Sequence, residues 1–114
     1  MMNFVFWQNI LKKYWGVSSN LSLLDGEYDL NILVKSNDGK QYVLKIMRED
    51  CLQEFVDMQI QAINHLKSIE LKLPFPNIIQ TISGKEFIRC KDEFGNNRLL
   101  WLIKKLPGQK YVEF

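Results

Sequence analysis

Two alternating runs of residues joined by a tight turn constrain the fold of this chain more than any other feature. The runs "LNILVKS" (30–36) and "KQYVLKIM" (40–47) have the period of two that is typical of β-strands. Between them, "NDGK" places Asp38 and Gly39 where a two-residue hairpin turn requires positive φ angles. A shorter run, "LSLL" (21–24), comes before them and leads into the turn "DGEYD". The sequence therefore predicts a three-stranded antiparallel meander.

The last of these strands carries a lysine among apolar residues. Lys45 shares one face of the predicted strand with Val43 and Met47, and the side chains of the other face are largely apolar as well. An ammonium group is costly to bury without a partner, so it either reaches water along its packed stem or meets a negative or amide side chain. Because both faces of the predicted sheet are apolar, both are expected to be covered. The helix predicted over 51–70 covers one, and no cover for the other is evident in the chain.

Helical spacing appears on both sides of the meander. In residues 3–15, large apolar side chains recur at i, i+3, i+4 and i+7, and Gly16 suits the position that ends a helix. We interpret this aromatic stripe as packing onto the core rather than as a surface for a partner. In 48–71 a second helix is predicted, with Asp50 as its N-cap and Gln53 completing a capping box. Its expected buried face consists of Leu52, Val56, Gln59, Ile60, Ile63 and Leu66.

Prolines end the second helix, and short strands follow it. "LPFPN" breaks the helix, and "NIIQTI" (77–82) is expected to be extended. "KEFIRCK" (85–91) and "RLLWLIKKL" (98–106) are predicted strands joined by the turn "DEFGNN", whose charges are expected to be solvated. The predicted fold class is α+β, a twisted antiparallel sheet of about five strands with one packed helix and an N-terminal helix. The length of 114 residues fits a single domain over 1–114.

Composition and charge exclude several classes of protein. The chain is 46% hydrophobic and 25% charged, which is too apolar for a disordered segment. Its net charge of +2 is too small and too evenly spread for a nucleic-acid-binding surface. The two cysteines have no metal-ligand spacing and are interpreted as reduced thiols. Because no signal peptide or membrane span is recognisable, the expected location is the cytoplasm and no membrane partner is expected.

The helix predicted over 51–70 offers two candidate partners for Lys45. With Val56 at the centre of the buried face, Glu54 lies almost opposite and is expected to be solvated. Asp57 lies on the flank of that face, and Gln59 lies within it. Either side chain could reach Lys45, and the sequence does not decide between them.

The order of these motifs resembles the N-terminal lobe of a protein-kinase-like fold. "GEYDLNILV", the hairpin "KSNDGKQ" and the strand "YVLKI" follow one another as the first three strands of that lobe do, with "YVLKI" where protein kinases carry V-A-I-K. The patterns L-x-G-E-x-D-x-N, D-M-Q-x-x-A-I-x-H-L and L-P-G are similar to those of the small-molecule branch, which includes aminoglycoside phosphotransferases and choline kinases. Within that branch the sequence is most similar to hydroxylysine-kinase-like and homoserine-kinase-like phosphotransferases. The resemblance extends from Tyr14 to Gly108.

This resemblance implies roles for particular residues in binding ATP. Lys45 would contact the α- and β-phosphates, and Asp57 or Gln59 would hold it in position. The turn Gly26–Asn31 would lie over the phosphates and donate backbone N–H groups. The adenine would meet the side chains of Leu24 and Val43, the gatekeeper Ile103, and the backbone of Lys104 and Leu106.

The same resemblance implies that the catalytic residues lie outside this chain. The fold takes its aspartate base from a loop of the form H-x-D-x-x-x-x-N, and further acids bind Mg²⁺. The only histidine, His65, has no acid two residues later. We therefore expect this chain to be the ATP-binding lobe of a kinase about three times as long, without catalytic residues or metal ligands of its own. The whole protein would bind ATP and Mg²⁺ and phosphorylate a small-molecule hydroxyl, whereas this chain alone would be inactive and hold no cofactor.

Two other hypotheses are compatible with the sequence. The chain could be a stand-alone α+β module that binds a protein partner through the uncovered sheet face, or it could belong to an inactive pseudokinase. If a catalytic lobe is missing, we also expect apolar surface around Ile103 and Leu106 to be exposed and to promote self-association.

Overall fold

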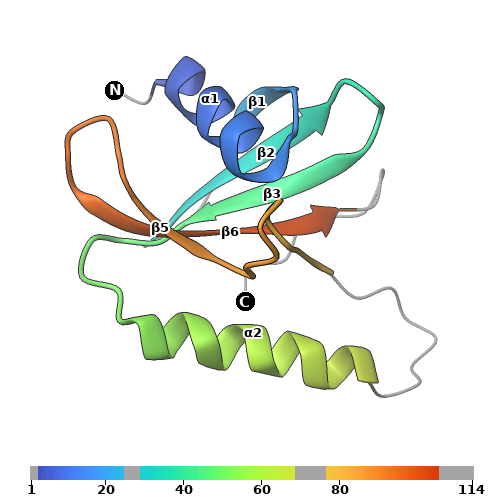
Figure 1. Cartoon of the computed structure of the whole chain (residues 1–114), viewed down its shortest axis with the longest axis vertical. Helices are drawn as coiled ribbons and strands as arrows, with labels where there is room; N and C mark the ends of the chain where they lie inside the picture. Colours follow the sequence, from blue (N-terminus) through green and yellow to red (C-terminus); the bar gives the residue numbers. More distant parts are fainter. Residues whose placement is uncertain (1–2, 25–28, 69–76, 106–114) are drawn as a thin grey trace.

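One antiparallel sheet between two helices forms the fold (Figure 1). The computed structural model describes residues 3–24, 29–68 and 77–105. Within these ranges the strand order is β1-β2-β3-β6-β4, and β5 also pairs with β6. The predicted α+β class is confirmed, with six strands described where about five were expected. The elements are α1 (Phe4–Trp15), β1 (Ser19–Leu24), β2 (Leu30–Ser36), β3 (Gln41–Ile46), α2 (Gln53–Ser68), β4 (Ile78–Ile79), β5 (Ile88–Lys91) and β6 (Asn97–Lys105).

Helix α1 covers one face of the sheet. It starts at the N-cap Asn3, whose side chain accepts a hydrogen bond from the Phe6 N–H, and it ends at Gly16, whose φ of 69° is left-handed. Its inward side chains are fully or nearly buried, and the Trp15 indole N–H donates to the Ile79 carbonyl at 3.0 Å. The main buried residues of this layer are Trp7, Leu11, Trp15, Ile32, Val34, Tyr42, Leu44, Ile46, Leu100 and Leu102.

The expectation that the chain lacks a cover for this face is wrong. The aromatic stripe over 3–15 packs onto the sheet, as its interpretation as a core-forming stripe required. The helix that precedes the meander folds back over the strands that follow it and supplies this cover. Figure 1 shows α1 above the sheet and α2 below it.

Helix α2 covers the opposite face but begins later than predicted. Its first residue is Gln53, so Asp50 is not the N-cap, and the Asp50 carboxylate lies 3.2 Å from Nε of Arg48 instead. Leu52 precedes the helix and is 69% exposed, so it does not belong to the buried face. Pro74, Pro76 and the Leu66 side chain lie outside the described structure. The buried residues of this layer are Val43, Met47, Val56, Ile60, Ile63, Leu99, Trp101 and Ile103.

The hairpin between β2 and β3 has a three-residue turn rather than the predicted two-residue turn. Ser36 and Lys40 close it, because the Ser36 N–H donates to the Lys40 carbonyl at 2.8 Å. Only Gly39 has a positive φ, of 88°, and Asp38 does not. The Asp38 carboxylate accepts a hydrogen bond from the Lys40 N–H at 3.1 Å, a local bond that suits aspartate in turns.

The turn between β5 and β6 is held by a buried carboxylate rather than by solvated charges. Asp92 accepts hydrogen bonds from the backbone N–H groups of Phe94 and Asn96 and from Nε of Arg98, each at 2.9 Å. Burial alone would raise the pKa of Asp92, but the two N–H donors and the Arg98 guanidinium outweigh it and hold that pKa below its usual value. The prediction of a fully solvated turn is therefore wrong at Asp92.

The two cysteines lie on opposite faces of the sheet. Cys90 packs against the α1 layer and Cys51 against the α2 layer. Burial, followed by the nearby charge of Asp92, raises the pKa of the Cys90 thiol to about 11. Both residues are free cysteines in the structure.

The packing of α1 on the sheet predicts a large effect of Leu11→Ala. Leu11 is completely buried, so the truncation leaves a cavity and is expected to lower the free energy of unfolding by about 2–5 kcal/mol. Val5→Ala is the matched control, because Val5 is 64% exposed on the same helix and its loss should change stability by about 0.5 kcal/mol or less. Urea unfolding measures both. Equal losses in the two variants would show that α1 does not cover the sheet.

The Asp92 turn predicts a contribution to stability that depends on pH. Because the folded-state pKa of Asp92 is lowered, its contribution is complete above the unfolded value of about 3.9 and is lost as the pH falls through the folded value. Asp92→Asn should reduce stability by roughly 1.5–3 kcal/mol at neutral pH and flatten the loss of stability in acid. Asp50→Asn removes an exposed carboxylate, so it should change neither the stability at neutral pH nor the dependence of stability on pH. Denaturant unfolding at several pH values would contradict this account if the two variants behaved alike.

Candidate functional site

The site is built from cross-strand rows on the face that α2 covers. In the first row, Lys45 of β3 lies between Asn31 of β2 and Trp101 of β6, and Leu24 of β1 lies opposite Asn31. In an antiparallel sheet, directly opposed residues point to the same face. The next row contains Ser22, Leu33, Val43, Ile103 and Ile78. The register therefore brings together residues that are far apart in the sequence.

Lys45 is buried at the centre of this face. Its side chain is 1% exposed, so the interpretation of a surface lysine with its head group in water is wrong. Its Nζ lies over the ring of Trp101, 5.6 Å from the ring centroid, within the range of a cation–π contact. The indole N–H of Trp101 points to Met47 Sδ at 3.2 Å. An ammonium group in such a place is typical of a site that binds an anion or an acidic partner.

The structure groups five of the residues for which the resemblance implies a nucleotide-binding role. Leu24, Asn31, Val43, Lys45 and Ile103 share the face, and Asn31 is fully buried with its amide donating to the Asp29 carbonyl at 3.4 Å. Gly26 and Leu106 lie outside the described residues.

The expected exposure of Ile103 needs a correction, and the structure narrows the predicted role of Lys104. Ile103 is only 2% exposed, so the expected open apolar surface around it is not found. It packs with the residues of the α2 layer. The N–H of Lys104 donates to the Asn77 carbonyl at 2.8 Å. A contact between the Lys104 backbone and a base would therefore have to use the Lys104 carbonyl oxygen.

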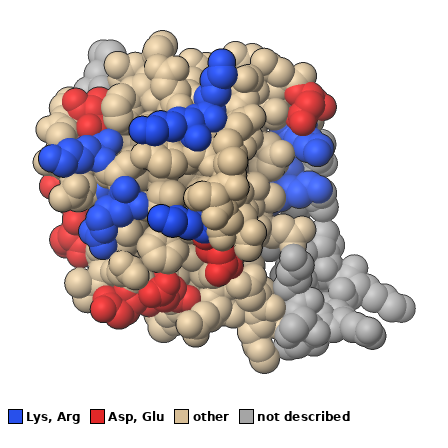
Figure 2. Space-filling model, in the orientation of Figure 1, with Lys and Arg blue, Asp and Glu red and all other residues tan. Residues whose placement is uncertain are grey.

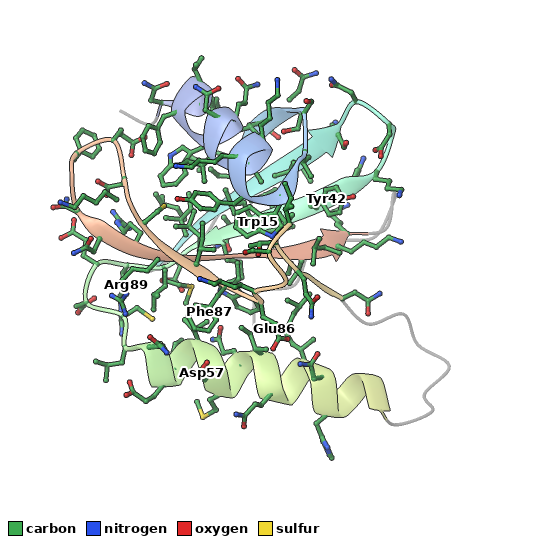
Figure 3. The ribbon with its side chains drawn as sticks, in the orientation of Figure 1. Trp15, Tyr42, Asp57, Glu86, Phe87 and Arg89 are labelled. Atoms are coloured by element: carbon green, nitrogen blue, oxygen red, sulfur yellow. The ribbon has the colours of Figure 1, made fainter. Side chains whose placement is uncertain are left out.

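Helix α2 presents the two candidate partners of Lys45 at the edges of its inward face. Asp57 and Gln59 are both half-buried, whereas Glu54 is exposed as expected. Figure 3 shows Asp57 on α2 and Trp15 on α1, on opposite sides of the sheet. Both Asp57 and Gln59 remain candidates for holding Lys45.

Charged side chains elsewhere do not form a patch of one sign. Figure 2 shows Lys and Arg interspersed with Asp and Glu over the viewed face. An open groove of about 460 Å³ lies beside Leu30 and the start of β6, with two arginines and two acids among its lining residues. Within the described ranges, no group of three or more His, Cys, Asp and Glu side chains is placed to hold a metal ion. Neither described helix is long and apolar enough to cross a bilayer.

Sequence reasoning missed Trp101 as part of the site. The alternation in "RLLWLIKKL" predicts a strand but gives no indication of which strand pairs with it. Only the register of β3 with β6 places the indole beside Lys45. An aromatic residue at an alternating position of a strand is most simply a core residue, so no local signal singled it out.

Comparison with known proteins agrees with the arrangement of these elements. No model of a protein family matches the sequence, and no curated protein matches it. A microcompartment-associated aminopropanol kinase matches 95% of this chain with a TM-score of 0.76 and 15% identity. The amicoumacin kinase hAmiN, solved in complex with AMP-PNP, Ca²⁺ and Ami, matches 93% with a TM-score of 0.69 and 22% identity.

The chain spans about a third of the length of each of these kinases, 33% in both cases. At such identities the likeness concerns the fold alone. The predicted resemblance is confirmed at that level, and the hydroxylysine-kinase-like and homoserine-kinase-like assignment is not. The chain has the fold of the N-terminal region of small-molecule kinases of the aminoglycoside-phosphotransferase type.

Proposed function

We propose that this chain is the nucleotide-binding lobe of an ATP-dependent phosphotransferase that acts on a hydroxyl of a small molecule. The observation that carries the proposal is the buried ammonium of Lys45 at the centre of the sheet, on the face lined by Leu24 and Val43. The fold supports it, because two kinases share this arrangement and one of them was solved with the nucleotide analogue AMP-PNP.

In this proposal, Lys45 acts as a point charge on the phosphates of ATP. A compact ammonium suits that task, and its fixed position in the sheet lowers the cost of orienting it. Leu24 and Ile103 flank the same face and would supply apolar contacts to the base, with the Lys104 carbonyl oxygen at its edge. Asp57 or Gln59 would position the ammonium from α2.

The chain alone is expected to bind nucleotide weakly. Val43 and Ile103 are almost completely buried, so a base can pack against them only if part of their cover moves. Mg²⁺ would be held by acidic residues of a second lobe, as in protein kinases. We propose that this second lobe also contributes the catalytic aspartate and the acceptor site. An encoded H-x-D-x-x-x-x-N motif after this segment would support that assignment.

The alternative of an interaction module that binds through an open sheet face loses its basis. Helix α1 occupies the face that the sequence left uncovered, and the opposite face is covered by α2. A pseudokinase would share the same lobe and differ only in the residues of its catalytic lobe. A nucleotide-binding lobe is therefore the function that the described residues support best.

Titration of the labelled chain with Mg–ADP, followed by NMR, tests this function. We expect millimolar affinity, with shift changes centred on the backbone amides of β3 and β6 around Lys45 and Ile103. Lys45→Met should abolish these changes because it removes the charge that meets the phosphates. Lys40→Met is the matched control, since Lys40 is exposed in the hairpin turn before the same strand. Shift changes that are absent, or equal in the two variants, would contradict the proposed function.

A further inference from the structure

The indole of Trp101 lies beside the Lys45 ammonium on the α2 face of the sheet. The two residues are direct cross-strand neighbours on β3 and β6, and Nζ lies 5.6 Å from the ring centroid. Both side chains are almost completely removed from water. The attraction between a cation and the negative face of an aromatic ring strengthens when both are desolvated. Trp7 and Trp15 lie in the α1 layer, on the other side of the sheet.

The Trp101 ring is fixed by contacts that continue to the β5–β6 turn. Its N–H points to Met47 Sδ at 3.2 Å, and the Met47 N–H donates to the Leu99 carbonyl at 2.9 Å. The Met47 carbonyl accepts a hydrogen bond from Arg98 at 3.0 Å, and Arg98 is in turn paired with Asp92. Hydrogen bonds from the backbone and from the side chains of Trp101 and Arg98 therefore fix Met47, at the end of β3, and the indole ring beside it.

We propose that Trp101 is a positioning residue for Lys45, holding the ammonium over its ring face so that the charge is directed to the nucleotide phosphates. This inference rests on the proposed nucleotide-binding function. It adds, on the sheet side of the ammonium, a second residue that positions Lys45. Asp57 or Gln59 would act from the helix side, whereas Trp101 limits the positions of the lysine stem from β6. A core residue without this role would supply packing only, and an aliphatic side chain of similar size would replace it.

The first measurement concerns the contact itself and needs no nucleotide. Protons held over an aromatic ring experience its ring current, so the Hε signals of Lys45 should lie upfield of those of the other lysines. Trp101→Phe keeps a smaller ring face at this position and should retain part of the displacement. Trp101→Leu should abolish it. An unchanged displacement in Trp101→Leu would overturn the proposal.

The second measurement concerns the consequence for binding. Trp101→Leu should weaken the affinity for Mg–ADP roughly tenfold, the loss expected when a desolvated cation–π contact disappears. Trp101→Phe should lie between this variant and the unmodified chain. Leu99→Ala is the matched control, because it removes core packing from the same strand and face without removing a ring. Its stability should fall while its affinity stays unchanged.

The outcomes separate this inference from the function on which it rests. If the unmodified chain binds Mg–ADP and Trp101→Leu binds it equally well, the positioning role is wrong and the proposed function stands. If the upfield signals are present but the unmodified chain does not bind Mg–ADP at millimolar concentration, the proposed function fails and the positioning role fails with it. If Trp101→Leu does not fold, Trp101→Phe decides, since unchanged Lys45 signals together with unchanged affinity would overturn the proposal.

Discussion

The antiparallel pairing of β3 with β6 is the constraint on which the rest of the structure depends. It joins the meander of the first half of the chain to the hairpin of the second half and forms the centre of the sheet. Because the pairing fixes which side chains share a face, it places Lys45 beside Trp101 and leaves one apolar layer for each helix. A shift of one residue would turn Lys45 toward the tryptophans of α1. The two faces thus have separate tasks, with α1 completing the core and α2 covering the face of the candidate site.

The elements of the fold were predictable wherever the signal was local. Period-two alternation predicted β2 and β3, and apolar spacing with a terminal glycine predicted α1. The start of α2 was predicted wrongly because Asp50 has the residue type of an N-cap but its carboxylate pairs with Arg48 before the helix begins. The cover of the α1 face was missed because it depends on contacts between distant segments, such as the hydrogen bond from Trp15 to Ile79. Alternation predicts two faces but not what packs on them.

In the candidate site, too, local features were predictable from the sequence and contacts between distant segments were not. The position of Lys45 among apolar neighbours left open whether its ammonium reaches water or meets a partner, and the structure shows the side chain buried. From their angular positions alone, Asp57 was placed on the flank of the inward face of the helix and Gln59 within that face, and both are half-buried. Trp101 could not be predicted, because its contact with Lys45 exists only in the register of β3 with β6. The exposed surface expected at Ile103 is absent because residues of the α2 layer cover that side chain.

Labelling with an acyl-phosphate derivative of ATP tests the central claim, that Lys45 meets nucleotide phosphates, most directly. In this reagent the lysine amine attacks the acyl carbonyl and forms an amide while ATP leaves, so only a lysine close to the bound phosphates reacts selectively. A simple acylating agent should modify Lys45 more slowly than the exposed Lys40, because Lys45 is buried. The nucleotide reagent should reverse this order, with Lys45 modified first and excess Mg–ATP suppressing the reaction. Modification of Lys40 and other exposed lysines alone, unaffected by Mg–ATP, would contradict the account.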